Sequence, residues 1–212
     1  MTEKELLPLY LDLSSKRVVI FGGGRVAERK ARLFSYYARV FVISKAFTPQ
    51  LTQMGKEGAL SLVQTDLSEG FERFFQDAFI AIPATNDPGL NGSIEMRAKE
   101  LGILVNKVDG VGDVVVPSIV RKGPLSITIS TKSPALTKYI RIKLDEELTE
   151  EYEGMARLLG QIRKELKIKV PDQEERSRRL WKVLQDYEVW RLLRKSYQEA
   201  YARACLDVFS DL

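Results

Sequence analysis

The sequence has no histidine and only one cysteine among its 212 residues. Histidine is the usual acid or base at neutral pH and the commonest metal ligand, so its absence leaves acid–base work to carboxylates, lysines and tyrosines. A single cysteine excludes an internal disulfide and, by ligand count, a structural zinc site. That cysteine, Cys205, lies among alanine, leucine and valine near the end of a helical stretch. We expect it to be a small buried hydrophobe rather than a nucleophile.

Long apolar runs and a strong excess of one charge are also lacking. No run approaches the roughly 20 residues that a membrane span needs, and residues 1–5 show neither the basic nor the apolar region of a signal peptide. We therefore expect a cytoplasmic protein without a membrane partner. The net charge of +4 suits nucleic acid or an anionic small molecule. Because acidic residues interleave with the basic ones around Trp181, we expect a solvated helix face there and no nucleic-acid partner.

Residues 18–30 carry the most informative pattern, in which an apolar strand leads into three consecutive glycines and then a helical stretch. With Gly22, Gly24 and Ala27 as its small residues, the segment fits the dinucleotide-binding pattern G-x-G-x-x-A. Gly22 permits the tight turn, Gly24 lets the backbone approach the phosphates, and Ala27 keeps strand and helix close. The helix N-terminus then faces the anion. A glycine-rich turn in another α/β unit is the alternative, but the flanking strand and helix favour a dinucleotide site.

Short apolar strands alternate with helical stretches from residue 17 to about 106, a pattern typical of a parallel sheet. We predict an α/β fold whose residues 1–113 form a Rossmann-type NAD-binding domain. The predicted strands are 18–21, 40–43, 59–63, 78–82 and 103–106. The predicted helices are 25–37, one that begins at Thr48-Pro49, and 91–101.

The pattern changes beyond residue 113. Residues 125–130 alternate apolar and polar side chains, which predicts a strand with one open or polar face. Ser133-Pro134 begins a helix that continues to about 147. We expect residues 114–147 to form a small α+β dimerisation segment. Apolar residues then recur every three or four positions, with a break at Pro171, so we expect residues 148–212 to form a C-terminal helical domain.

Ser44 and Lys45 follow the second predicted strand, about 20 residues past the glycines, where an NAD-binding unit usually carries an acidic residue for the ribose. Two interpretations fit these residues. Lys45 binds a 2′-phosphate, which indicates NADP, or Ser44 hydrogen-bonds the ribose while Lys45 is solvated. The second interpretation is favoured.

Two further groups lie at the carboxyl ends of predicted strands, where open α/β sheets bind ligands. Thr85 and Asn86 follow the fourth strand and fit either a contact with nicotinamide or a turn built on the sequence that follows. Asp109 follows the fifth strand. It fits either a general base beside apolar valines or a loop-capping aspartate before Gly110, and the residue pattern alone favours the cap.

Five motifs can be compared with a known family in their residues, order and spacing. They are Gly22-Gly23-Gly24-Arg25-Val26-Ala27-Glu28-Arg29-Lys30-Ala31, Ala84-Thr85-Asn86-Asp87, Asn106-Lys107-Val108-Asp109, Pro117-Ser118-Ile119 and Ser130-Thr131-Lys132-Ser133-Pro134. Together they resemble the siroheme synthase dehydrogenase family, and the resemblance covers essentially the whole chain. This family comprises precorrin-2 dehydrogenases, some of which are also sirohydrochlorin ferrochelatases. One departure is the compact Thr131-Lys132-Ser133, because members often carry extra glycines in that motif.

The resemblance implies an NAD-dependent oxidoreductase that converts precorrin-2 into sirohydrochlorin in siroheme biosynthesis. It implies a homodimer, with NADP as an open alternative cofactor and Fe²⁺ as a further substrate in a chelatase. Asp109 takes the acid–base role, and would contact the metal in a chelatase. The implied cofactor-binding residues are Gly22, Gly24, Arg25, Val26, Ser44, Lys45 and Thr85. The implied substrate-facing residues are Asn106, Lys107, Ser133 and Lys138.

An NAD(H)-sensing regulatory module without catalysis is the alternative from another class of protein. Such modules also begin with a strand and a G-x-G turn. They normally carry an acidic residue after the second strand, where this chain has Ser44, and they have no need of the segment from Pro117 to Pro134.

Overall fold

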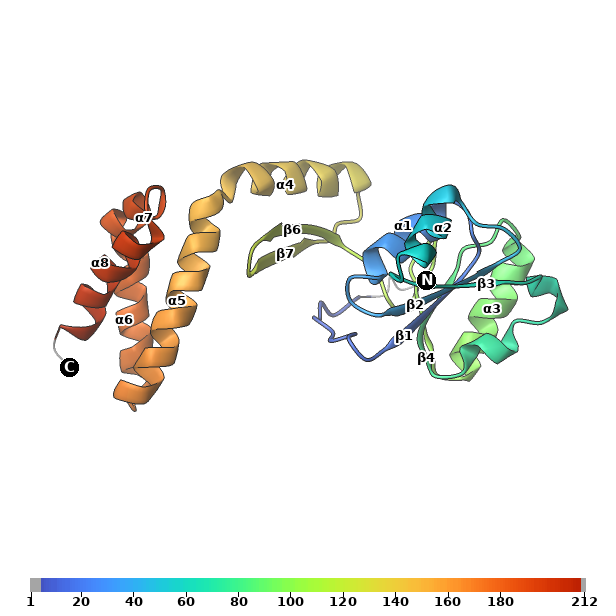
Figure 1. Cartoon of the computed structure of the whole chain (residues 1–212), viewed down its shortest axis with the longest axis horizontal. Coiled ribbons are helices and arrows are strands. Elements are labelled where there is room, and N and C mark those ends of the chain that lie inside the picture. The colour runs from blue at the N-terminus through green and yellow to red at the C-terminus, as the bar shows by residue number, and fades with distance from the viewer. Residues whose placement is uncertain (1–4, 211–212) are drawn as a thin grey trace. The chain divides into compact units, whose positions relative to one another are not determined.

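The structure, a computed structural model, describes residues 5–210. The chain divides into two compact units, Met1–Val116 and Pro117–Leu212. The first unit holds an α/β sheet and the second holds a β-hairpin followed by helices (Figure 1).

The first unit is a five-stranded parallel sheet in the order β3-β2-β1-β4-β5. This confirms the predicted Rossmann-type parallel sheet. The strands are β1 (Arg17–Phe21), β2 (Arg39–Ser44), β3 (Ser61–Gln64), β4 (Ala78–Pro83) and β5 (Leu104–Val105). The α-helices are α1 (Arg25–Phe34), α2 (Pro49–Lys56) and α3 (Pro88–Glu100), and two short 3₁₀ helices, η1 (Leu67–Glu69) and η2 (Glu72–Phe75), precede β4.

Both faces of this sheet are covered, which explains why its strands are almost continuously apolar. Helices α1 and α2 cover one face and α3 the other (Figure 1). Val18 and Ile20 of β1 pack on the face of α1 and α2, whereas Val19 and Phe21 pack on the face of α3 and η2. All four side chains are fully buried. Because successive strand residues point to opposite faces, β1 anchors both layers, and its carboxyl end is held firmly between them.

Helix capping sets where α2 and α3 begin. Thr48 accepts a hydrogen bond from the backbone N–H of Leu51, with Pro49 at the first helical position, as the sequence predicted. Asp87 accepts bonds from the N–H groups of Gly89 and Leu90, so α3 begins three residues earlier than predicted. Among the strands, β5 is shorter than predicted and β3 begins two residues later.

The second unit begins with an antiparallel hairpin of β6 (Ser118–Lys122) and β7 (Leu125–Ile129), joined by a turn with Gly123 at φ +53°. The sequence predicted β7 but not β6. Helix α4 (Pro134–Glu147) follows, and the Ser133 hydroxyl caps it by accepting a bond from the N–H of Leu136 at 3.3 Å. The predicted α4 is therefore confirmed at both ends.

The remaining helices are α5 (Glu150–Lys169), α6 (Gln173–Gln185), α7 (Tyr187–Leu193) and α8 (Tyr197–Phe209). They share a core that includes the fully buried Leu158, Ile162, Val183 and Ala204. Cys205 on α8 is half-buried rather than buried, and this partial burial raises the pKa of its thiol. None of the helices within residues 5–210 has the combination of length and apolar character needed to cross a membrane.

Candidate dinucleotide-binding site

The first glycine after β1 is required by its surroundings. Gly22 has φ +123°, and a Cβ built on it would lie 2.2 Å from the carbonyl oxygen of Ala84. Its N–H donates to the carbonyl of Ile43 at 2.8 Å, while the N–H of Ala84 donates to the carbonyl of Phe21 at 2.7 Å. Three neighbouring strands therefore end in close contact at Gly22, and only glycine fits.

The second glycine is equally restricted, although the G-x-G pattern treats it as variable. A Cβ on Gly23 would lie 1.9 Å from the carbonyl oxygen of Ala46, and the carbonyl of Gly23 accepts a bond from the N–H of Thr48 at 3.0 Å. The β1–α1 turn and the β2–α2 turn thus pack backbone against backbone. Sequence reasoning missed this role, for which three consecutive glycines were the only signal.

Gly24 differs from both, because a Cβ built on it would meet no atom of residues 5–210 within 4 Å. It is the N-cap of α1 and makes no side-chain capping bond. The first N–H groups of α1 therefore lack the capping acceptor found at α2 and α3. Open space beside a helix N-terminus is what an anionic phosphate group needs, so these residues fit a dinucleotide pyrophosphate.

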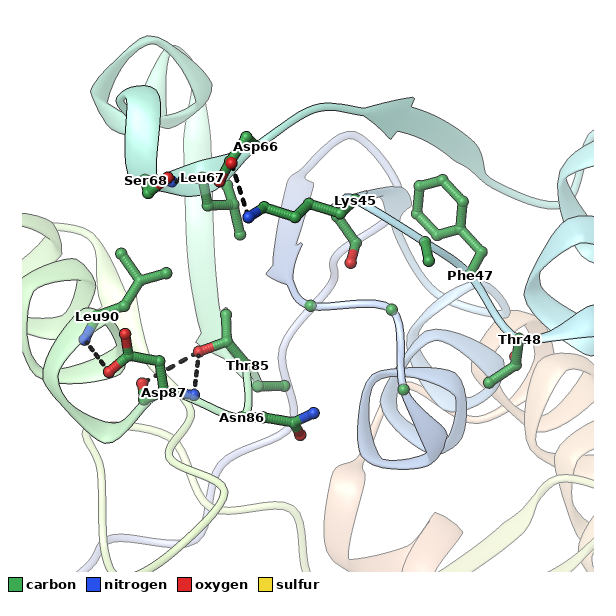
Figure 2. A pocket seen from close by; sticks show the side chains of 16 residues that line it. Lys45, Phe47, Thr48, Asp66, Leu67, Ser68, Thr85, Asn86, Asp87 and Leu90 are labelled. Atoms are coloured by element: carbon green, nitrogen blue, oxygen red, sulfur yellow. Dashed lines mark hydrogen bonds and ion pairs between the residues drawn. The ribbon is translucent and has the colours of Figure 1, made fainter.

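A cavity of about 680 Å³ opens beside this turn. Its walls come from the carboxyl ends of β1, β2, β3 and β4, the edge at which open α/β sheets bind ligands (Figure 2). The lining residues are Gly22, Gly23, Gly24, Ser44, Lys45, Ala46, Phe47, Thr48, Asp66, Leu67, Ser68, Ala84, Thr85, Asn86, Asp87 and Leu90. Of the predicted cofactor-binding residues, the structure thus brings together Gly22, Gly24, Ser44, Lys45 and Thr85.

Arg25 and Val26, the other two predicted cofactor-binding residues, are the first residues of α1 and do not line the cavity. Arg25 is exposed and Val26 is half-buried. One turn further along α1, Glu28 accepts a bond from the Thr48 hydroxyl at 2.7 Å and pairs with Arg32 at 3.0 Å. The bond between Thr48 and Glu28 ties the start of α2 to α1 beside the cavity.

Lys45 is neither simply solvated nor free, because its Nζ lies 2.7 Å from Oδ2 of Asp66. Figure 2 shows the lysine reaching across the cavity wall to this carboxylate. Hydrogen bonds from Lys45 and from Ser68 lower the pKa of Asp66 to about 2. Sequence reasoning missed Asp66 and Ser68, which follow the third strand rather than the second.

Thr85 is held by a tight network at the end of β4. Its hydroxyl bonds to Oδ1 of Asn91 at 2.8 Å and to the carbonyl of Asp87 at 3.1 Å, and its backbone N–H also donates to Asn91. Of the two interpretations offered by the sequence, a turn or a contact with nicotinamide, the turn describes the Thr85 hydroxyl. Asn86 lines the cavity, and Figure 2 shows its side chain directed away from this network toward the glycine turn.

Asp109 lies outside this cavity, on an exposed loop after β5. The loop closes on itself, because the N–H groups of Asp113 and Val114 both donate to the carbonyl of Val105 at 2.9 and 3.1 Å. In return, Oδ2 of Asp113 accepts the N–H of Val105 at 3.1 Å. Asp109 is thus presented to solvent at the carboxyl edge of the same sheet.

The predicted substrate-facing residues fall in different surroundings. Asn106 is only 2% exposed and donates to the carbonyl of Val114 at 2.7 Å, so it holds the loop rather than facing solvent. Lys107 pairs with Glu95 of α3 at 2.8 Å, which lowers the pKa of Glu95. Ser133 and Lys138 are exposed residues of the second unit, at the start of α4. Among residues 5–210 there is no cluster of three or more His, Cys, Asp or Glu arranged to hold a metal ion.

Comparison with known proteins agrees with this geometry. Residues 9–118 match a family model described as "Putative NAD(P)-binding". Together with the parallel sheet, the open Gly24 and the uncapped α1, this match defines a Rossmann-type NAD(P)-binding protein.

Individual relatives narrow the class. The chain is 45% identical over 204 residues to a precorrin-2 dehydrogenase of Methanosarcina barkeri, covering 93% of this chain and 91% of the relative. It is 34% identical over 183 residues to a siroheme synthase of Citrobacter koseri, of which it covers 39%. The solved structure named "SirC, precorrin-2 dehydrogenase" superposes with a TM-score of 0.74 over 94% of this chain and 98% of that one, at 23% identity, and so shares the fold. The chain belongs to the precorrin-2 dehydrogenase family.

Proposed function

We propose that this protein catalyses the NAD-dependent oxidation of precorrin-2 to sirohydrochlorin, a step in siroheme formation. The observation that carries the proposal is the 45% identity, across 93% of the chain, with a relative named precorrin-2 dehydrogenase. The cavity beside Gly24 supports it, because it leaves open space at a helix N-terminus, where a phosphate group can bind.

We assign each part of the cofactor to one group of the residues that line the cavity. Gly24 and the N–H groups of α1 hold the pyrophosphate, and the ends of β2 and β3 hold the adenosine ribose. Thr85 and Asn86, across the glycine turn, border the nicotinamide side. A nicotinamide bound there supplies the hydride acceptor.

Asp109 is the proposed base. Oxidation of precorrin-2 removes a hydride and a proton, and Asp109 accepts that proton before passing it to solvent. The support is positional: Asp109 lies on an exposed loop whose two ends are tied to β5, at the sheet edge that also forms the cavity.

We further propose a homodimer built through residues 114–147, with Ser133 and Lys138 near the substrate. Helix α4 supports this assembly, because none of its residues is buried within a single chain. Its apolar side chains Leu136, Tyr139 and Ile142 are 48%, 60% and 39% exposed.

An anaerobic assay with precorrin-2 tests the function directly. The full chain, given precorrin-2 and NAD, is expected to form sirohydrochlorin and NADH in equal amounts. Asp109→Ala is expected to bind NAD as the unaltered protein does and to lose at least about 100-fold in turnover. Undiminished turnover of this variant would remove Asp109 as the base.

The same assay separates the alternatives. NAD binding without any turnover of precorrin-2 would favour an NAD(H)-sensing module over an enzyme. Addition of Fe²⁺ after the oxidation tests for the ferrochelatase activity that some members of the family have. Parallel reactions with NADP measure the cofactor preference.

A further inference from the structure

We infer that Asp66, at the end of β3, selects NAD over NADP by pairing with Lys45 and by accepting a hydrogen bond from the adenosine ribose. The inference rests on the proposed dinucleotide function. It assigns the acidic residue that the sequence pattern lacks after the second strand.

Strand register places Asp66 at this position. β2 and β3 run parallel with Ser44 opposite Gln64, and the pairing continues past their ends. The N–H of Thr65 donates to the carbonyl of Ser44 at 3.0 Å, and the Gln64 side chain donates to the carbonyl of Lys45 at 3.0 Å. Asp66 therefore lies beside the end of β2, where a Rossmann unit usually places its ribose-binding acid.

The ion pair determines whether the cavity accepts a 2′-phosphate beside Lys45. An unpaired lysine at the end of β2 would attract a 2′-phosphate, but Lys45 has Asp66 as its partner at 2.7 Å. A 2′-phosphate would have to displace this carboxylate and would then lie close to its negative charge. Rejection of a competing ligand by a repulsive group is a common basis of specificity.

The carboxylate also retains capacity for a ribose hydroxyl. Oδ1 accepts the N–H of Ser68 at 2.9 Å and its hydroxyl at 2.7 Å, while Oδ2 accepts from Lys45. A carboxylate offers about four acceptor positions, so one remains on Oδ2 after the bonds found within residues 5–210. The bonds to Ser68 cap η1 and fix the orientation of the carboxylate, and both residues line the cavity.

Titration of NAD and NADP onto the full chain tests this inference, with calorimetry giving each dissociation constant. The unaltered protein is expected to bind NAD at least about tenfold more tightly than NADP. Asp66→Asn keeps an oxygen to cap η1 but removes the charge, and it is expected to reduce that preference at least about tenfold, since a charge-assisted bond to the phosphate is gained. Adding Lys45→Ala to this variant is expected to cancel the gain in NADP binding.

Two further variants act as controls. Asp87→Asn removes a carboxylate from the same cavity and also preserves a helix cap, but Asp87 lies at the end of β4, which β2 and β1 separate from β3 in the sheet. Its ratio of NAD to NADP affinity is expected to stay within about twofold of the unaltered ratio, because screening weakens distant charges. Lys45→Ala alone tests the pair without altering Asp66, and is expected to weaken NADP binding while NAD binding is kept.

The outcomes distinguish this inference from the proposed function. An unchanged preference in both Asp66→Asn and Lys45→Ala, in protein that still binds NAD, overturns the role of Asp66 and leaves the dehydrogenase proposal standing. An equal shift in Asp87→Asn also overturns it, because the effect would then follow net charge. Failure of the unaltered chain to bind either dinucleotide overturns both.

Discussion

At the scale of single residues, the three glycines of the turn after β1 have two different roles. Gly22 and Gly23 are glycines because the carbonyls of Ala84 and Ala46 occupy the space of a side chain. Gly24 has no such neighbour in the described part of the chain, and its missing side chain leaves space in the cavity. The first two positions therefore serve folding, and the third is the one that we propose serves binding.

This division predicts opposite effects for two substitutions of the same kind. Gly22→Ala is expected to lower the free energy of unfolding by about 2 kcal/mol or more, because it combines a positive φ with a backbone clash. Gly24→Ala is expected to change it by less than about 1 kcal/mol but to weaken NAD binding at least about tenfold. Urea unfolding and NAD titration measure the two quantities, and the reverse pattern would contradict the assignment.

Sequence reasoning located Gly22, Gly24, Ser44, Lys45 and Thr85 near the strand ends because those positions follow from one local pattern each. It missed Asp66, since the contact with Lys45 depends on the register between β2 and β3. Gly23 was missed for a similar reason. Its constraint comes from the backbone of another loop, which no local pattern records.

At the scale of secondary-structure elements, hydrogen bonds close the loop that follows β5, and we call this closure the clasp. The backbone of Val105 exchanges hydrogen bonds with Asp113, and Asn106 donates to the carbonyl of Val114. A Cβ on Gly112 would lie 2.3 Å from the carbonyl oxygen of Val105, so this return of the chain requires glycine too. The clasp fixes the two ends of the loop that carries Asp109.

Breaking the hydrogen bonds of the clasp is expected to reduce turnover without changing cofactor binding. Asp113→Ala leaves the N–H of Val105 without its side-chain acceptor, and we expect a loss of about 1–2 kcal/mol in stability. We also expect faster hydrogen exchange in residues 106–112, reduced turnover of precorrin-2 and unchanged affinity for NAD. Reduced NAD affinity would show instead that the loop supports the cavity.

The alternation of apolar and helical stretches in the sequence predicted most elements, but it did not predict β6. Its Ser-Ile-Val-Arg-Lys sequence is too short and too mixed to show a period, and it becomes a strand through pairing with β7. β5 has only two paired residues; the N–H of Asn106 still donates to the carbonyl of Ala81 on β4, and beyond it the chain turns and returns at Val114, which accepts a bond from the Asn106 side chain. Both outcomes depend on tertiary contacts rather than on local propensity.

At the scale of the whole molecule, the exposed apolar face of α4 predicts self-association. Leu136→Glu combined with Ile142→Glu is expected to convert a dimer into a monomer, because charge would replace apolar area in the interface. Analytical ultracentrifugation measures the change. Met96→Glu is the matched control, since Met96 is an exposed apolar residue on a helix of the other unit and is 62% exposed. A dimer that survives the α4 variant would place the interface elsewhere.

The backbone contact between Gly23 and Ala46 has a consequence for how the site recognises its ligand. Since the β1–α1 and β2–α2 turns share a hydrogen bond from Thr48 to Gly23 and leave no space between them, they are ordered when the sheet folds. Dinucleotide binding then has little loop entropy to overcome. Selection between related ligands depends on the few side chains at the rim, and a change of cofactor preference can evolve by substitution alone, without rebuilding a loop.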